Sequence, residues 1–119
     1  MMDFVDRWAG FWSAPDPARV DDLAAPEIEL RYPGLAEPLR GVEAWRDRVA
    51  SIVDRFPDIR LTVTDHAAAG DLCFVSWRGN ATVNGKSLSW EGIDRMRLRD
   101  GLVVDSLVAF DTAALRAAA

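Results

Sequence analysis

An acidic side chain lies within an apolar stripe of the segment WEGIDRMRLRDG, residues 90–101. If this segment is a strand, one side of it carries Trp90, Gly92, Asp94, Met96 and Leu98. An ionised carboxylate is very costly to bury without partners, so such a group usually has a raised pKa and can keep its proton. We therefore interpret Asp94 as an acid–base group or a neutral hydrogen-bond donor in a ligand site. The alternative is that it pairs with an arginine or a backbone amide and anchors a bend in the strand.

Three aromatic residues are further candidates for the same site. Tyr32 ends the apolar face of the alternating segment EIELRY, where its hydroxyl group either meets a ligand or reaches water. Trp8 and Trp12 share the apolar face of the helix predicted over residues 3–12. These two indoles either line a pocket or fill the core.

Two polar residues of the strand LCFVSWRGNATV are also predicted to contact a ligand. Arg78 and Asn80 share a strand face with Leu72, Phe74 and Ser76, so this face changes from apolar to polar along its length. A pocket wall that opens to solvent has this pattern, and Arg78 and Asn80 would then orient a polar substituent. The alternative for Arg78 is an ordinary surface charge.

The element order that must position these residues is typical of an α+β domain. Apolar periodicity and capping residues predict helices over residues 3–12, between Asp16 and Pro26, over 42–56, and in an Ala-rich tail over 111–119. Alternation predicts strands over residues 27–32, 59–65, 72–83, 86–99 and 102–110. Asn84-Gly85 and Asp100-Gly101 favour tight hairpins. We expect one domain, residues 1–119, in which a curved antiparallel sheet packs against helices on one face and leaves a cavity between them.

Composition argues against several classes of protein. The formal net charge of −5 disfavours a nucleic-acid partner, and no apolar run is long enough to span a membrane. The acidic N-terminal segment does not read as a signal peptide, so we expect a cytoplasmic protein. One histidine and one cysteine do not make a usual zinc site, and no glycine-rich nucleotide motif is present, so we expect neither a metal nor a cofactor. Cys73 lies in an apolar run and is interpreted as a buried core residue.

Four segments and their spacing resemble the SnoaL-like branch of the nuclear transport factor 2-like superfamily. They are FVDRWAGFW, DPARVDDLAAPEIELRYP, PLRGVEAWRDRVASIVDRFPDIRLTV and NATVNGKSLSWEGIDRMRLRDGLVVDSLVAFD. The resemblance implies a cystatin-like fold, in which a curved antiparallel sheet wraps around three helices from the N-terminal half and forms a cone-shaped apolar pocket. It also implies a homodimer. The superfamily includes steroid isomerases, polyketide cyclases, epoxide hydrolases and dehydratases, as well as members without catalytic activity.

The resemblance relates Asp94 to a catalytic residue in more than one group of enzymes of the superfamily. In steroid isomerases it matches the protonated acid, whereas Trp8 stands in the place of a tyrosine and Tyr32 in the place of the base. In polyketide cyclases Asp94 matches the second polar residue, and Val108 stands where the acid–base aspartate would be.

The epoxide hydrolases of the superfamily use an acid–Arg–acid set. Here Arg78-Gly79-Asn80 keeps the arginine of that set without its acid, and Val108 again replaces the acid of the last strand. Asp111, three residues further along, is predicted to cap the C-terminal helix instead.

These patterns together predict a protein that binds an apolar, polyketide- or steroid-like small molecule. Asp94 and Tyr32 are the candidate catalytic residues of a cofactor-independent isomerase, cyclase or dehydratase. The residues predicted to contact the ligand are Trp8, Trp12, Arg78, Asn80, Trp90, Met96 and Val108. The alternative is a non-catalytic ligand-binding module or dimeric scaffold of the same fold. The apolar strand face with Val75, Trp77 and Val83 is predicted to meet the core or the second subunit of a homodimer.

Overall fold

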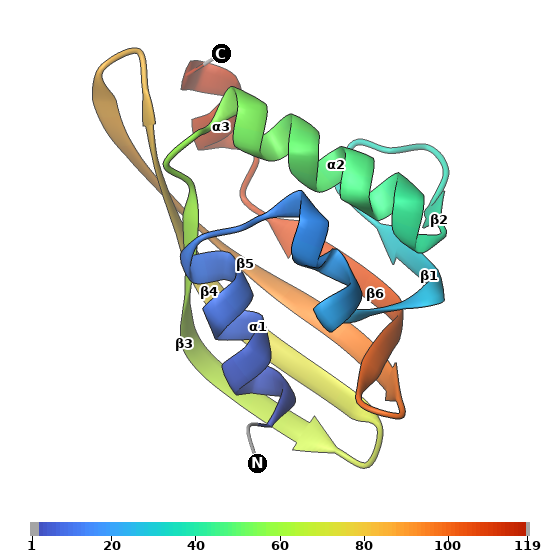
Figure 1. The fold of residues 1–119 in the computed structure, drawn as a ribbon. Coiled ribbons are helices and arrows are strands. Elements are labelled where there is room, and N and C mark those ends of the chain that lie inside the picture. The colour runs from blue at the N-terminus through green and yellow to red at the C-terminus, as the bar shows by residue number, and fades with distance from the viewer. Residues whose placement is uncertain (1–2, 119) are drawn as a thin grey trace.

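The computed structural model describes residues 3–118, in which a curved six-stranded sheet carries helices on one face (Figure 1). We call this the inner face of the sheet and the opposite one the outer face. The helices are α1 (Phe4–Ser13), the 3-10 helix η1 (Pro17–Asp22), α2 (Val42–Arg55) and α3 (Ala113–Ala118). The strands are β1 (Ala24–Arg31), β2 (Leu39–Arg40), β3 (Arg60–Ala69), β4 (Leu72–Val83), β5 (Lys86–Arg99) and β6 (Leu102–Phe110). The predicted α+β fold class is confirmed.

The sheet is mixed rather than wholly antiparallel, which corrects one detail of the sequence-based prediction. The strand order is β2-β1-β6-β5-β4-β3, and β1 runs parallel to β6 with Leu30 opposite Ser106. The short β2, which is not among the predicted strands, pairs antiparallel with β1 at the edge. The second helical segment ends at Asp22, and β1 begins at Ala24, before Pro26.

Two tight turns set the register of the long strands β4, β5 and β6. Asn84 and Gly85 both have positive φ angles, of 53° and 75°, and Asp100 and Gly101 have φ angles of 53° and 78°. Such turns match the twist of the flanking strands, so the predicted hairpins form at these dipeptides. As a result β4 and β5 pair without interruption from Val83 opposite Lys86 to Leu72 opposite Arg97.

Aspartate side chains cap α1, η1 and α3. Asp3 accepts a hydrogen bond from the Asp6 amide at 2.9 Å, and Asp16 accepts one from the Ala18 amide at 2.9 Å. Asp111 accepts a hydrogen bond from the Ala113 amide at 2.9 Å, so its predicted role as a cap of the C-terminal helix is confirmed.

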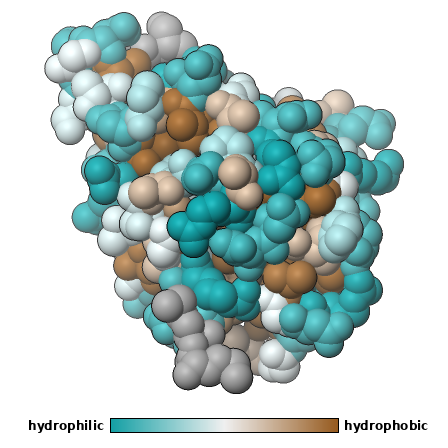
Figure 2. Space-filling model, in the orientation of Figure 1, coloured by the Kyte–Doolittle hydropathy of each residue, from teal (hydrophilic) through white to brown (hydrophobic). Residues whose placement is uncertain are grey.

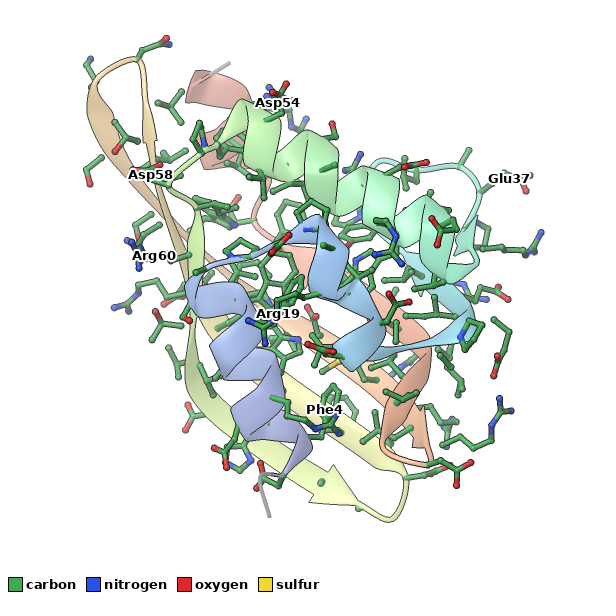
Figure 3. All side chains as sticks on the ribbon, viewed as in Figure 1. Phe4, Arg19, Glu37, Asp54, Asp58 and Arg60 are labelled. Carbon is green, nitrogen blue, oxygen red and sulfur yellow. The ribbon has the colours of Figure 1, made fainter. Side chains whose placement is uncertain are left out.

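The core lies between the inner face of the sheet and the helices α1, η1 and α2. Trp8 and Val49 are almost fully buried there, and Phe4 points into it from the first turn of α1 (Figure 3). Cys73 is also buried and unpaired, as predicted, and burial raises the pKa of its thiol. The hairpin of β4 and β5 projects beyond this core (Figure 1). Asp58 (Figure 3) accepts hydrogen bonds from the Thr82 amide and hydroxyl, close to the turn of this hairpin.

Candidate functional site

Asp94 lies on the inner face of β5 between two aliphatic neighbours. Its register partners are Val75 on β4 and Val108 on β6, and all three residues point toward the helices. The aspartate is only 8% exposed. Valine side chains offer no hydrogen bond and exclude water, so the carboxylate has lost much of its solvation.

Indole N–H groups replace part of the hydrogen bonding that water would have given the Asp94 carboxyl group. The Trp77 Nε1–H group donates a hydrogen bond to Asp94 Oδ1 at 2.9 Å. Burial raises the pKa of Asp94 from 3.8 to about 6, while hydrogen bonding from Trp77 and Trp8 acts in the opposite direction. Asp94 can therefore exchange a proton near neutral pH, which is the range in which acid–base catalysis is most effective.

Two Trp–Gly pairs give the inner face of the hairpin its shape. Trp77 lies opposite Gly92, and Trp90 lies opposite Gly79. A Cβ atom at Gly79 would lie 2.5 Å from the Trp90 indole, and one at Gly92 would overlap the Trp77 indole. Because both glycines lack this atom, each indole can lie across the neighbouring strand instead of standing out into the space under the helices.

Tyr32 directly follows β1 and approaches the same space from the other end of the sheet. Its hydroxyl oxygen accepts a hydrogen bond from Trp45 Nε1 at 3.2 Å, so its own proton is free to be donated elsewhere. The Arg48 guanidinium lies 5.2 Å from the centre of the Tyr32 ring. Burial and the nearby charge of Asp94 raise the pKa of Tyr32, so this phenol stays protonated.

These groups border a cavity of about 290 Å³ between the sheet, α2 and α3. Its lining combines apolar and aromatic side chains with a few polar groups: Trp12, Tyr32, Arg48, Ser51, Ile52, Arg55, Phe56, Ile59, Leu61, Trp77, Trp90, Asp94, Val108, Phe110, Thr112, Leu115 and Arg116. A second hollow of about 20 Å³ shares Trp12, Tyr32, Asp94 and Val108 with it. In Figure 2, apolar side chains gather on the surface near the C-terminal end of α2, where lining residues of this helix lie. Such a cavity, with few convergent polar groups, is typical of a small-molecule site.

Comparison with known proteins identifies the family. The family model described as SnoaL-like domain matches residues 5–106. The chain belongs to the SnoaL-like family. Its fold is accordingly that of the nuclear transport factor 2-like superfamily. No curated protein matches the sequence significantly.

Solved structures share this fold over nearly the whole chain. IdmH from Streptomyces antibioticus, described as a candidate polyketide cyclase, is 21% identical with a TM-score of 0.86, over 96% of this chain and 94% of its own. A protein from Catenulispora acidiphila with a ketosteroid isomerase-like fold, in complex with trimethylamine, is 16% identical with a TM-score of 0.85, over 97% and 90% of the two chains. TerC, co-crystallised with polyporic acid, is 17% identical with a TM-score of 0.83, over 97% and 94%.

Most of the residues predicted from the sequence lie around the SnoaL-like cavity. Asp94, Tyr32, Trp12, Trp90 and Val108 all line the main cavity. Trp8 and Met96 lie deeper, where each is 2% exposed and borders the smaller hollow.

The predicted position of Arg78 and Asn80 in the pocket wall is wrong. Both lie on the outer face of β4 and are exposed, and Arg78 pairs there with Glu91 at 3.3 Å. The strand is in the opposite phase because Trp77 and Val75 pair with the inner-face residues of β5. For the same reason, Val75 and Trp77 belong to the core and the cavity wall, so they are not available to a second subunit.

Trp77, Arg48 and Arg55 are among the cavity-lining residues that the sequence analysis missed. Trp77 was assigned to the core or to an interface, although its alternation with Gly79 resembles that of Trp90 with Gly92. Arg48 and Arg55 on α2 are seven residues apart, beside the apolar stripe that contains Ile52. Residues at this spacing share one side of a helix, so the signal was present in the helical periodicity.

Neither a metal-binding cluster nor a membrane-spanning helix is found among the described residues. Residues 3–118 contain no group of three or more His, Cys, Asp or Glu side chains that could hold a metal. Over the same residues, no helix is long and apolar enough to cross a bilayer. The polar groups that border the cavity are the carboxyl group of Asp94, the phenol of Tyr32, and indole, hydroxyl and guanidinium groups.

Proposed function

We propose that this protein binds an apolar, ring-containing small molecule with a carbonyl group in the cavity between the sheet and α2. The observation that carries the proposal is the position of Asp94, a desolvated carboxyl group that borders a cavity lined mainly by aromatic and aliphatic side chains. Trp12, Trp77 and Trp90 offer flat surfaces on which fused rings pack well. The family membership and the polyporic acid complex of TerC support a ligand of this class.

The chemistry that fits these groups is proton transfer without a cofactor. In its ionised form Asp94 removes a proton from the carbon next to the ligand carbonyl, and the electron pair moves to the carbonyl oxygen as an enolate. Tyr32 is held as a phenol and donates a hydrogen bond to that oxygen, which stabilises the developing charge. Asp94 then returns its proton to a second carbon, so that atoms and charge balance in an isomerisation. A ring closure or a dehydration would use the same two groups.

A non-catalytic binding protein is the second candidate, and one observation favours it. Val108 faces the cavity at the position where the resemblance to polyketide cyclases would put an acid–base aspartate. Asp94 would then be a hydrogen-bonding group for the ligand, and the protein would store or carry the molecule.

The experiment that tests the proposal begins with a thermal-shift screen against steroids, polyphenols and epoxides. Hits are then titrated into wild type, Asp94→Asn and the control Asp54→Asn, whose aspartate is exposed on α2 outside the cavity (Figure 3). We expect Asp94→Asn to abolish turnover, or to weaken binding in a non-catalytic protein, and Asp54→Asn to behave as wild type. Wild-type binding and turnover in Asp94→Asn would overturn the proposal.

A further inference from the structure

Arg48 has an unsatisfied donor beside the cavity. It is half-buried on α2, its guanidinium group stacks over the Tyr32 ring, and its Nε atom is buried without a hydrogen-bond partner. Buried polar atoms in proteins are nearly always paired, so the Arg48 guanidinium group is incompletely satisfied by the described residues. Its neighbour Arg46, on the same helix, is fully engaged with Asp21 and Glu43.

The charged groups on the cavity wall are predominantly positive. Arg48, Arg55 and Arg116 line the cavity, and none of them forms an ion pair with an acid of residues 3–118. Arg55 stacks on Phe56, and Arg116 donates to the Thr112 hydroxyl at 2.6 Å. Asp94 is the only acidic side chain of the described lining. A positive wall is unexpected in a chain whose formal net charge is −5.

Asp94 does not neutralise the positive charge of these arginines, because it is not paired with any of them. Asp94 accepts its hydrogen bond from Trp77 rather than from an arginine, and its neighbours across the sheet are valines. A cation inside a partly dry cavity attracts anions more strongly than one on an open surface, because the local dielectric constant is lower. The planar fork of an arginine also matches two oxygen atoms of a carboxylate.

We propose that the ligand of this cavity carries an anionic oxygen group, a carboxylate or an ionised enol, and that Arg48 binds it. The inference rests on the proposed function, because it requires that the cavity holds a small molecule. The anionic group lies at the α2 wall beside the Tyr32 hydroxyl, and the rings of the ligand extend over the indoles of Trp77 and Trp90. Arg55 and Arg116 are both exposed, so they attract the anion to the cavity and contribute less to the bound state.

The test compares pairs of probes that differ in charge and hardly in shape. Naphthoate is paired with naphthamide. Hydroxynaphthoquinone with its hydroxyl group on the quinone ring, which is ionised at neutral pH, is paired with the corresponding methoxynaphthoquinone. Binding to the full chain is measured by calorimetry at neutral pH. We expect wild type to bind at least one anion about 10- to 100-fold more tightly than its neutral counterpart, the range expected for charge-assisted hydrogen bonds. The two pairs distinguish a carboxylate site from an enolate site.

Variants then assign the preference to one side chain. Arg48→Gln should remove the preference for the anion and leave the affinity for the neutral probe within about threefold, whereas Arg48→Lys should keep part of the preference. Arg78→Gln is the matched control, because Arg78 is an exposed arginine on the outer face of the sheet, and it should change neither affinity. The comparison of charged and neutral probes in wild type does not depend on whether a variant folds.

Three outcomes would overturn the inference. Equal binding of charged and neutral probes by wild type rejects an anionic ligand while the proposed function stands. An anion preference that survives in Arg48→Gln rejects the assignment to Arg48. If neither member of either pair binds, the proposed function fails and the inference fails with it.

Discussion

The decisive feature at the residue scale is the carboxyl group of Asp94, which is buried without a positively charged partner. Asp94 lies between two valines, accepts a hydrogen bond from an indole, and faces a cavity whose arginines pair with no acid of the described chain. A residue that served only to stabilise the fold would gain more from an apolar side chain at this position. The cost of keeping an acid here is understandable if the acid acts on a ligand.

The raised pKa of Asp94 predicts a specific dependence of stability on pH. With a folded-state pKa of about 6 and an ordinary value of 3.8, the folded protein binds more protons than the unfolded chain in this interval. The contribution of Asp94 to stability therefore falls as the pH rises from about 4 to about 6. Asparagine cannot ionise, so Asp94→Asn should exceed wild type in free energy of unfolding by up to about 3 kcal/mol above about pH 7, and differ little near pH 4.

Urea denaturation of the two proteins at several pH values measures this difference. The Asp54→Asn protein serves as a control for the loss of an exposed carboxylate. A difference between Asp94→Asn and wild type that is the same at low and high pH would show that Asp94 is not desolvated in the folded protein.

The sequence predicted the orientation of some residues of the site correctly and that of others wrongly. The alternation in residues 90–98 was sufficient to place Asp94 and Trp90 on the inner face. The strand with Arg78 was ambiguous, because both of its faces carry large apolar residues, and Phe74 lies on the exposed one. The hydropathy pattern of a sequence does not show which face of a strand points inward when the exposed face is also apolar.

At the scale of elements, the hairpin turn contained the missing information. A two-residue loop at Asn84-Gly85 requires Val83 to pair with Lys86, and counting back along both strands puts Val75 opposite Asp94. Directly paired residues in an antiparallel ladder project to the same face. The turn and the position of Asp94 thus imply together that Val75 and Trp77 face inward and Arg78 outward.

The reciprocal Trp–Gly pairs predict a steric effect in the same hairpin. A methyl group at Gly92 would overlap the Trp77 indole and come within 2.8 Å of the Phe110 Cβ atom, so Gly92→Ala should lower the free energy of unfolding by about 1–3 kcal/mol. Gly10→Ala is the matched control, because Gly10 lies in α1, where an added methyl group would have no atom within 4 Å. This control should gain about 0.5–1 kcal/mol, since alanine favours the helix. Equal effects of the two substitutions in urea denaturation would contradict the packing described for Trp77.

At the scale of the whole molecule, the sheet packs against three helices of the N-terminal half as the resemblance implied, but the cavity is bordered by the sheet, α2 and α3. The parallel pairing of β1 with β6 could not be predicted, because these strands are distant in sequence and no local turn dictates their relation. The place of α3 beside the cavity could not be predicted for the same reason. The Ala-rich composition of this segment predicts a helix but contains no signal for where the helix packs.

A homodimer remains a prediction, and its interface must differ from the one first expected. Val75 and Trp77 are enclosed within the chain, whereas Phe74 and Ile93 on the outer face of the sheet are 41% and 50% exposed. Exposed apolar residues that lie together on a sheet favour association. We expect sedimentation at micromolar concentration to show a dimer and Ile93→Lys to shift it toward the monomer. A wild-type monomer under these conditions would contradict the prediction.

The most direct test of the central claim is a carbon-detected NMR titration of the Asp94 carboxyl group in the free protein and with the neutral probe naphthamide at saturation. We predict a midpoint near pH 6 in the free protein, and a higher one with the probe, because the probe displaces water from a carboxyl group that borders the cavity. A midpoint near the ordinary value of 3.8 that the probe leaves unchanged would contradict the claim that Asp94 is a buried acid facing a ligand site.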